Sequence, residues 1–160
     1  MSDVRRAVPE DAPELLRLRQ VMLDTIHPGA PAGSTDWQRA SLPAVRERLA
    51  DPDGDFAAFV IDHPVRPGAL AALVVGTLEY RIGGPQDPSG RSGHIFSVAT
   101  DPDVRRRGYA RACMEALLDW FRERDAGHVD LNASPEGEPL YASLGFARKP
   151  DPAMRLRLKG

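Results

Sequence analysis

Apolar and polar residues follow two periods along the chain, and together these periods predict a succession of helices and strands. Apolar residues that recur about every 3.6 positions mark helices, and short apolar runs bounded by Gly, Pro and Asp mark strands. The predicted element order is β-α-α-β-β-β-α-β-α-β. The predicted strands are Asp3 to Ala7, Phe56 to Ile61, Ala69 to Tyr80, Gly93 to Thr100, His128 to Ala133 and Met154 to Leu158.

Four helices are predicted between these strands. The first runs from Pro9 to about Thr25 and stops at residues 27–33, where two prolines and two glycines cannot continue a helix. The second begins at Ser34 or Asp36, and Pro43 argues against its first half. The other two are an amphipathic helix that ends near Arg124 and a short helix from Ser134 to Leu144.

The run from Ala69 to Tyr80 has almost no polar residue before Thr77. Such a strand is expected in the middle of a sheet, covered on both faces. With its two neighbours it predicts an antiparallel meander. Because there is no repeat, low-complexity tract or linker, we expect one domain over residues 1–160 of the α/β (α+β) class, with a mixed, mostly antiparallel sheet.

Composition narrows the classes of partner. The net charge is -2, with 28% charged and 42% hydrophobic residues, which argues against general binding of nucleic acid. The longest apolar stretch, around Ala69 to Val75, is far shorter than the roughly 20 residues that span a membrane. No secretory signal is evident, so a soluble, cytoplasmic protein is expected. The single cysteine, Cys113, is predicted to be a small buried hydrophobic residue. The four histidines lack metal-ligand spacing, so no metal is predicted.

A tight basic turn from Asp101 to Ala110 joins a predicted strand to a predicted helix. The first turn of a helix has unpaired N–H groups and a positive dipole end, which attract an anion where no side chain blocks the backbone. Gly108 and Ala110 are small, and three arginines, 105 to 107, supply charge and forked donors. Such a charge run can be merely solvated, but its position favours a phosphate site.

The stretch Arg105-Arg106-Arg107-Gly108-Tyr109-Ala110 has the form [QR]-x-x-G-x-[GA], and it lies in a longer pattern. Residues 98–102 precede it, and residues 132–134 and 140–146 follow it, the last similar to an LY-x-x-x-GF signature. Over nearly its whole length the chain therefore resembles the GNAT superfamily of N-acetyltransferases. The resemblance implies a single-domain GNAT-like fold, acetyl-CoA as cosubstrate, and direct transfer of acetyl to a primary amine through a tetrahedral intermediate.

The resemblance also implies roles for individual residues. The main chain of Val98 and Thr100 would pair with the pantetheine arm, with an N–H near Val98 polarising the thioester carbonyl. Tyr141 would protonate the departing thiolate, although a core tyrosine beside Leu140 is the alternative. The implied cofactor-binding residues are Val98, Ala99, Thr100, Arg105, Arg106, Arg107, Gly108, Tyr109, Ala110, Arg111 and Asn132.

The general base and the acceptor are less defined. The strand from Ile95 to Ala99 carries no acid, so Glu79 on the neighbouring strand is the candidate base, acting through water. The missing acid keeps open a non-catalytic acyl-CoA-binding or sensor module. The acceptor is a small-molecule or peptide amine: peptide N-termini, lysines, polyamines, aminoglycosides and amino acids are all open. The loop of residues 27–33 either lines the acceptor pocket or is a plain connector, and a homodimer is expected from the resemblance alone.

Overall fold

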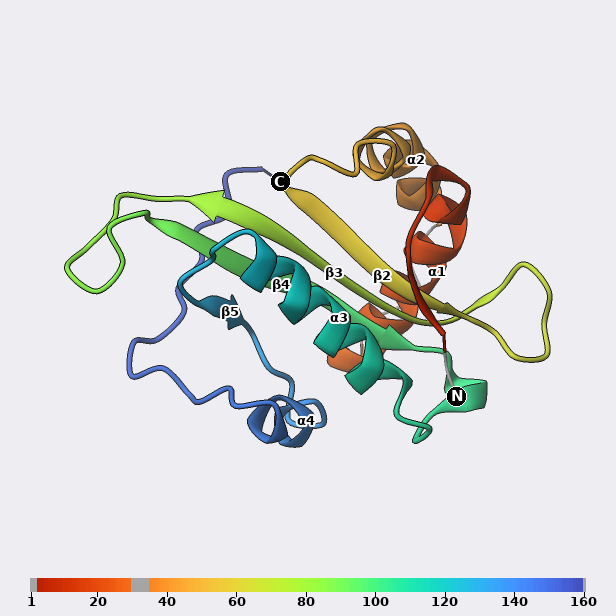
Figure 1. Ribbon diagram of the computed structural model, residues 1–160. Helices are drawn as coiled ribbons and strands as arrows, with labels where there is room; N and C mark the ends of the chain where they lie inside the picture. The colour runs from red at the N-terminus through yellow and green to blue at the C-terminus, as the bar shows by residue number, and fades with distance from the viewer. Residues whose placement is uncertain (1–2, 30–34, 160) are drawn as a thin grey trace.

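The computed structural model describes residues 3–29 and 35–159, and its centre is a five-stranded sheet (Figure 1). The strands lie in the order β1-β2-β3-β4-β5. Neighbours from β1 to β4 are antiparallel, and β4 pairs with β5 in parallel. The strands are β1 (Val4–Arg6), β2 (Phe56–Asp62), β3 (Leu70–Tyr80), β4 (Arg91–Thr100) and β5 (Val129–Leu131).

Helices cover both faces of this sheet. Figure 1 shows α3 across one face and α1 with α2 behind the other, while α4 lies beyond β5. In the described part of the chain no helix is long and apolar enough to cross a membrane. The helices are α1 (Ala12–Ile26), α2 (Asp36–Leu49), α3 (Tyr109–Glu123) and α4 (Glu138–Ser143), with short 3-10 turns η1 (Pro9–Asp11) and η2 (Pro102–Val104).

β3 lies between two hydrophobic cores, as its apolar sequence predicts. Leu73 and Val75 pack in the core under α1 and α2, whereas Ala72 and Val74 pack in the core under α3. Every residue from Leu70 to Gly76 is buried. The prediction of a central strand covered on both faces is therefore confirmed.

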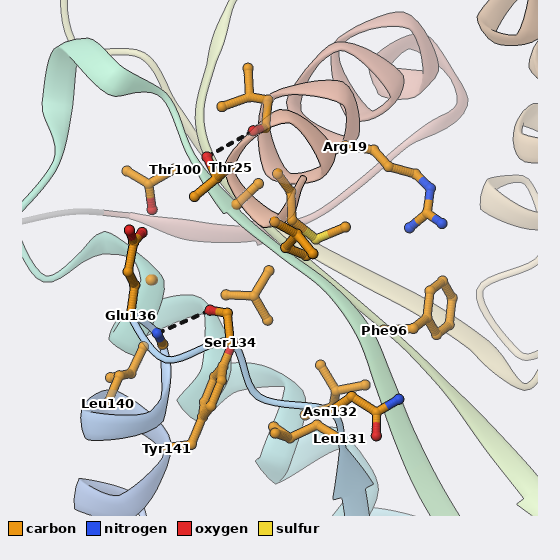
Figure 2. Close-up of a pocket in the computed structure, with 18 of the residues that line it drawn as sticks. Arg19, Thr25, Phe96, Thr100, Leu131, Asn132, Ser134, Glu136, Leu140 and Tyr141 are labelled. Atoms are coloured by element: carbon orange, nitrogen blue, oxygen red, sulfur yellow. Dashed lines mark hydrogen bonds between the residues drawn. The ribbon is translucent and has the colours of Figure 1, made fainter. Parts of the chain in front are cut away.

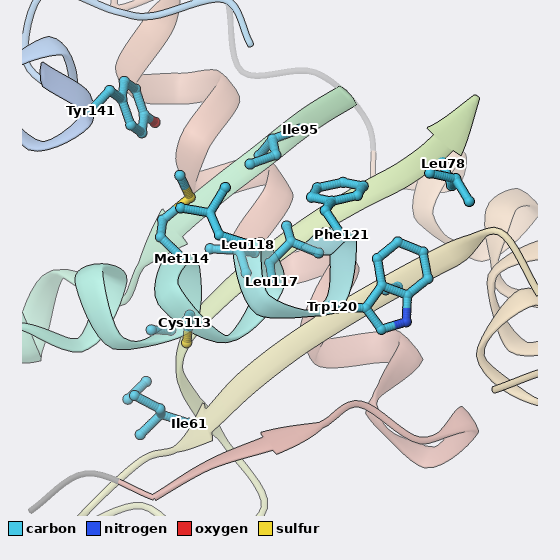
Figure 3. Packing of buried hydrophobic residues seen from close by; sticks show 14 of the residues in the cluster. Ile61, Leu78, Ile95, Cys113, Met114, Leu117, Leu118, Trp120, Phe121 and Tyr141 are labelled. Atoms are coloured by element: carbon cyan, nitrogen blue, oxygen red, sulfur yellow. The ribbon is translucent and has the colours of Figure 1, made fainter. Parts of the chain in front are cut away.

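One face of α3 is apolar, and it packs against the sheet to form the core under this helix. Met114, Leu117 and Phe121 are buried there (Figure 3). A Cβ added at Gly93 in β4 would lie 2.6 Å from the Phe121 ring, so only glycine lets the helix approach this closely. Cys113 belongs to the same face, and burial raises the pKa of its thiol to about 12, in keeping with a packing role.

The second and fourth helices differ from their predicted extents. α2 continues through Pro43, which is exposed, although the proline removes one helical hydrogen bond and crowds the carbonyl of the preceding turn. α4 begins at Glu138 and not at Ser134. The Ser134 Oγ accepts a hydrogen bond from the N–H of Gly137 (3.1 Å), the N-cap residue, so the predicted cap closes a turn that precedes the helix.

The prediction of a sixth strand from Met154 to Leu158 is wrong. These residues form no strand, and the side chains of Met154, Leu156 and Leu158 are 92%, 82% and 89% exposed. Alternating apolar residues specify a strand only when one face of it is buried and a ladder partner is available. Neither condition holds here, so the observed sheet ends at β5 in the described part of the chain.

Candidate functional site

A cleft opens where β4 and β5 separate. The parallel ladder has three pairs, and the last joins Ile95 to Leu131. β4 then continues to Thr100, while the chain after Leu131 turns toward α4. The cavity between the diverging segments has a volume of about 820 Å³, and its lining comes from α1, β4, the turn before α3, and the segment from Leu131 to Tyr141.

A β-bulge in β4 accompanies this separation. Val75 of β3 pairs with Ser97. The next residue, Gly76, pairs with Ile95, which leaves Phe96 as an extra residue in β4. Bulges of this kind bend a strand and turn its later residues to a new orientation.

The bulge decides which backbone groups of β4 face the cleft. Before it, the N–H of Gly93 donates toward β5 (2.9 Å). After it, the N–H of Asp101 donates to the carbonyl of Ala71 in β3 (2.8 Å). Because backbone groups alternate sides along a strand, those of Val98 and Thr100 point away from β3, toward the gap left by β5. Val98 and Thr100 also line the cleft, together with Ala99 between them.

The turn before α3 closes one end of the cleft. Gly108 at the helix N-cap has a φ of 79° and Arg106 a φ of 64°, so two left-handed residues make the turn tight. No N–H from Arg105 to Arg111 donates to another backbone group among the described residues. The seven residues all line the cleft, and the side chains of the three arginines in the turn are exposed. This end therefore presents unpaired N–H donors and positive charge to a ligand.

A buried carboxylate holds the base of the turn. Asp101 is 2% exposed, and it accepts hydrogen bonds from Arg17 (2.9 Å), from Arg66 and from the N–H of Asp103 (3.0 Å). Burial alone would raise the pKa of the Asp101 carboxyl. The donated hydrogen bonds and the two guanidinium charges outweigh burial, so this pKa lies below the ordinary 3.8. Asp101 thereby ties the turn to α1 and to the loop between β2 and β3.

His63 lies beside this carboxylate, and its Nε2 has no hydrogen-bond partner among the described residues. Ligand atoms of His63, Asp101 and Asp103 lie within 4.8 Å of one another, a separation that a metal ion could bridge. However, the Nδ1 of His63 accepts hydrogen bonds from the N–H groups of Val65 (3.1 Å) and Arg66 (3.0 Å). The proton of a neutral imidazole is then on Nε2, which leaves no lone pair there for a metal. We assign no metal to this group.

α4 supplies the wall that carries Tyr141. Its ring is 9% exposed, and Figure 2 shows it rising from α4 toward Ser134 in the cleft. Burial raises the pKa of Tyr141 above 10.0, so the hydroxyl keeps its proton at neutral pH. Arg111 of α3 donates a hydrogen bond to Ser143, which joins this wall to the helix N-terminus. Tyr141 is both a core residue and a cleft residue, so the two readings of the sequence are compatible.

The opposite wall comes from α1, which the sequence did not single out. Arg19 and Met22 line the cleft from this helix. Phe96 and His94 line the same side from β4, with ring centroids 6.3 Å apart and an interplanar angle of 18°. The apolar stripe of α1 indicates a core helix, and nothing in its spacing indicates that its C-terminal half reaches a cleft. His27 also lines the cavity, whereas residues 30–34 of the same loop lie outside the described residues.

The structure brings together all the predicted site residues except Glu79. Asn132 lies directly after the last paired residue of β5 and lines the cleft. Glu79 lines a separate hollow with Arg48 and Phe56, and its carboxylate pairs with Arg81 (3.2 Å). The candidate base is therefore not placed next to Tyr141.

Comparisons with known proteins agree with this geometry. The model of the Acetyltransferase (GNAT) family matches residues 21–146. Glucosamine 6-phosphate N-acetyltransferase 1 of Oryza sativa subsp. japonica is 29% identical over 142 residues, which are 85% of this chain and 84% of that protein. The ribosomal protein bS18-alanine N-acetyltransferase of Escherichia coli (strain K12) is 36% identical over 55 residues, which are 32% of this chain and 37% of that protein.

A solved structure shows the same arrangement of elements. The protein from Clostridium acetobutylicum, described as a predicted acetyltransferase with acetyl-CoA, gives a TM-score of 0.80 at 22% sequence identity. The match covers 99% of this chain and 97% of that chain. At this identity the likeness establishes the fold. The homodimer and the cytoplasmic location expected from the sequence stay predictions.

Proposed function

Because the chain belongs to the Acetyltransferase (GNAT) family, we propose that it transfers the acetyl group of acetyl-CoA directly to a primary amine. The observation that carries the proposal is the gap between β4 and β5 beyond Ile95 and Leu131. It combines free backbone groups of Val98 and Thr100 with a basic helix N-terminus at one end. A long ligand with a phosphate group and an amide-containing arm fits that combination, as acetyl-CoA does.

In this proposal the turn binds the pyrophosphate. The unpaired N–H groups between Arg105 and Arg111 would donate to its oxygens, and the arginine side chains would add charge-assisted contacts. The arm would lie along β4 and pair with the backbone of Val98 and Thr100. The thioester carbonyl would then accept a hydrogen bond from the Val98 N–H, which stabilises the oxyanion of the tetrahedral intermediate.

The amine nitrogen would attack the thioester carbon, forming the C–N bond before the C–S bond breaks. The electron pair of the C–S bond leaves on the sulfur. Tyr141 would donate its hydroxyl proton to this thiolate and recover a proton from solvent. Its raised pKa supports the role, since the hydroxyl is protonated when the reaction begins.

The attacking amine must lose a proton, and we propose His94 as its acceptor, directly or through one water. His94 is half-buried and lines the cleft on β4, on the same wall as Phe96. An imidazole is the side chain used most often for this step. Glu79 has no contact with the cleft, so it receives no role in the transfer.

The test is acetyl transfer to a panel of primary amines, followed through the release of free CoA, with acetyl-CoA binding measured separately by calorimetry. Binding together with amine-dependent CoA release is the expected result. Binding without release across the panel would favour the non-catalytic acyl-CoA-binding module. No binding of acetyl-CoA would reject both functions.

A further inference from the structure

Arg19 is a half-buried cation on the cleft wall with no anionic partner in residues 3–29 and 35–159. Its Nη1 donates to the Oγ of Ser97 at 2.6 Å, and no carboxylate of the described residues pairs with its guanidinium. Two residues earlier on α1, Arg17 pairs with both Glu14 (2.6 Å) and Asp101 (2.9 Å). A guanidinium has five N–H donors, so Arg19 retains most of its donors for a ligand.

Ser97 holds this guanidinium in place. Its side chain is buried, 2% exposed, and it belongs to the strand segment directly after the bulge at Phe96. A hydrogen bond to a buried hydroxyl limits the rotamers of a long side chain, which lowers the entropy lost when an anion binds. The guanidinium of Arg19 is thus oriented at the cleft wall, unlike that of a freely moving, solvated arginine.

Arg19 lies at the end of the cleft away from the pyrophosphate turn. Figure 2 shows Arg19 and Phe96 at one end and Thr100 with Glu136 at the other. Phe96 and Thr100 are four positions apart along an extended strand, a distance of about 13 Å. An anion at Arg19 would therefore be a different group from the pyrophosphate proposed to bind at the turn.

The charges around the cleft favour an anion at this end. Six arginines line the cavity, and Glu136 is the one acidic residue among the described lining residues. Glu136 lies at the far end, beside Thr100 in Figure 2. An anion that approaches Arg19 is therefore attracted by the arginines, and the one acidic residue of the described lining is too far away to repel it strongly.

We propose that Arg19 binds an anionic group, a carboxylate or a phosphate, carried by the amine acceptor. The inference rests on the proposed transferase function. His94 and Phe96 lie on the same side of the cleft, so an acceptor anchored through its anion at Arg19 would present its amine to the thioester beside them. The site then selects acidic amines over neutral amines and over polycationic acceptors such as polyamines.

Matched pairs of acceptors test this selection. Glucosamine 6-phosphate is compared with glucosamine, and an α-amino acid with its amide, so that each pair differs in one anionic group. Wild type should give the higher kcat/KM for the anionic member of at least one pair, and which pair it is distinguishes phosphate from carboxylate. Arg19→Gln should lower that value about 10- to 100-fold, leave the neutral member within about twofold, and be partly rescued in Arg19→Lys.

Arg39→Gln is the matched control, because Arg39 is an exposed arginine of α2 outside the cleft. It removes the same charge and should change neither member of a pair. Equal kcat/KM for both members in wild type, or an equal loss for both in Arg19→Gln, would overturn the proposal.

A binding measurement separates this inference from the transferase function. Inorganic phosphate is titrated into the protein saturated with CoA, so that the turn is already occupied, and the Nε–H resonances of the arginines are followed by NMR. The Arg19 resonance should shift in wild type and in Arg39→Gln, and Arg19→Gln should lose the binding. Phosphate binding that persists in Arg19→Gln contradicts the anion site. Binding at Arg19 without acetylation of any amine supports the site and rejects the transferase function.

Discussion

The ring of Tyr141 packs edge to face against Phe146, with centroids 6.1 Å apart and an interplanar angle of 66°. Tyr141→Phe keeps this contact and removes only the hydroxyl, so it separates chemistry from packing. If Tyr141 protonates the departing thiolate, kcat should fall about 100-fold or more. The free energy of unfolding should change by less than about 1 kcal/mol, measured by urea denaturation.

Tyr80→Phe is the control for this variant, because Tyr80 is 63% exposed and does not line the cleft. It should leave kcat unchanged. A Tyr141→Phe protein with wild-type kcat would show that the tyrosine is a packing residue and that solvent protonates the thiolate.

Substitution of His94 and of Glu79 should have opposite effects on activity if His94 is the proton acceptor. We expect His94→Gln to lower kcat/KM about 100-fold, since a neutral amide cannot take up a proton. We expect Glu79→Gln to stay within about twofold of wild type, because Glu79 lies in a different hollow and pairs with Arg81. The reverse pattern in the same assay would restore the carboxylate as the base.

The sequence predicts most of the fold and one side of the site. The family resemblance, the mixed sheet, the four helices and the acyltransferase class are confirmed, because each depends on local periodicity or on a contiguous motif such as 105–110. Arg19 and His94 were missed as cleft residues because they come from different elements, and no contiguous motif marks either of them. The strand predicted from Met154 failed because alternation does not reveal whether a ladder partner is available.

A comparison of Gly108 with Gly68 separates the role of the turn before α3 in acetyl-CoA binding from the cost of backbone strain. Both have a left-handed φ, 79° and 78°, and an added Cβ would meet no atom within 4 Å at either position. An alanine should therefore cost each variant a similar stability of about 1 kcal/mol. Only Gly108→Ala should also raise KM for acetyl-CoA, by about tenfold, because relaxation of that turn moves the N–H donors at the start of α3.

Thermal or urea unfolding gives the stability of the two glycine variants, and initial rates at varied acetyl-CoA give KM. Gly68 lies in the loop between β2 and β3 and does not line the cleft. Equal KM values in the two variants would mean that the turn does not bind the cosubstrate.

The buried carboxylate of Asp101 should make a pH-dependent contribution to the free energy of unfolding. Asp101→Asn removes the buried negative charge that Arg17 and Arg66 share, and it should lower the free energy of unfolding at pH 7 by about 2 kcal/mol. Because the pKa of the folded carboxyl lies below 3.8, its stabilisation is complete above that pH and is lost as the pH falls through the folded-state value. The difference between wild type and Asp101→Asn should therefore narrow below pH 3.8.

Asp103→Asn is the control, since the side chain of Asp103 is 62% exposed and its substitution should change the free energy of unfolding by less than about 0.5 kcal/mol at any pH. Urea denaturation of the three proteins between pH 7 and pH 3 measures both effects, and a difference for Asp101→Asn that stays constant down to pH 3 would contradict the charge network.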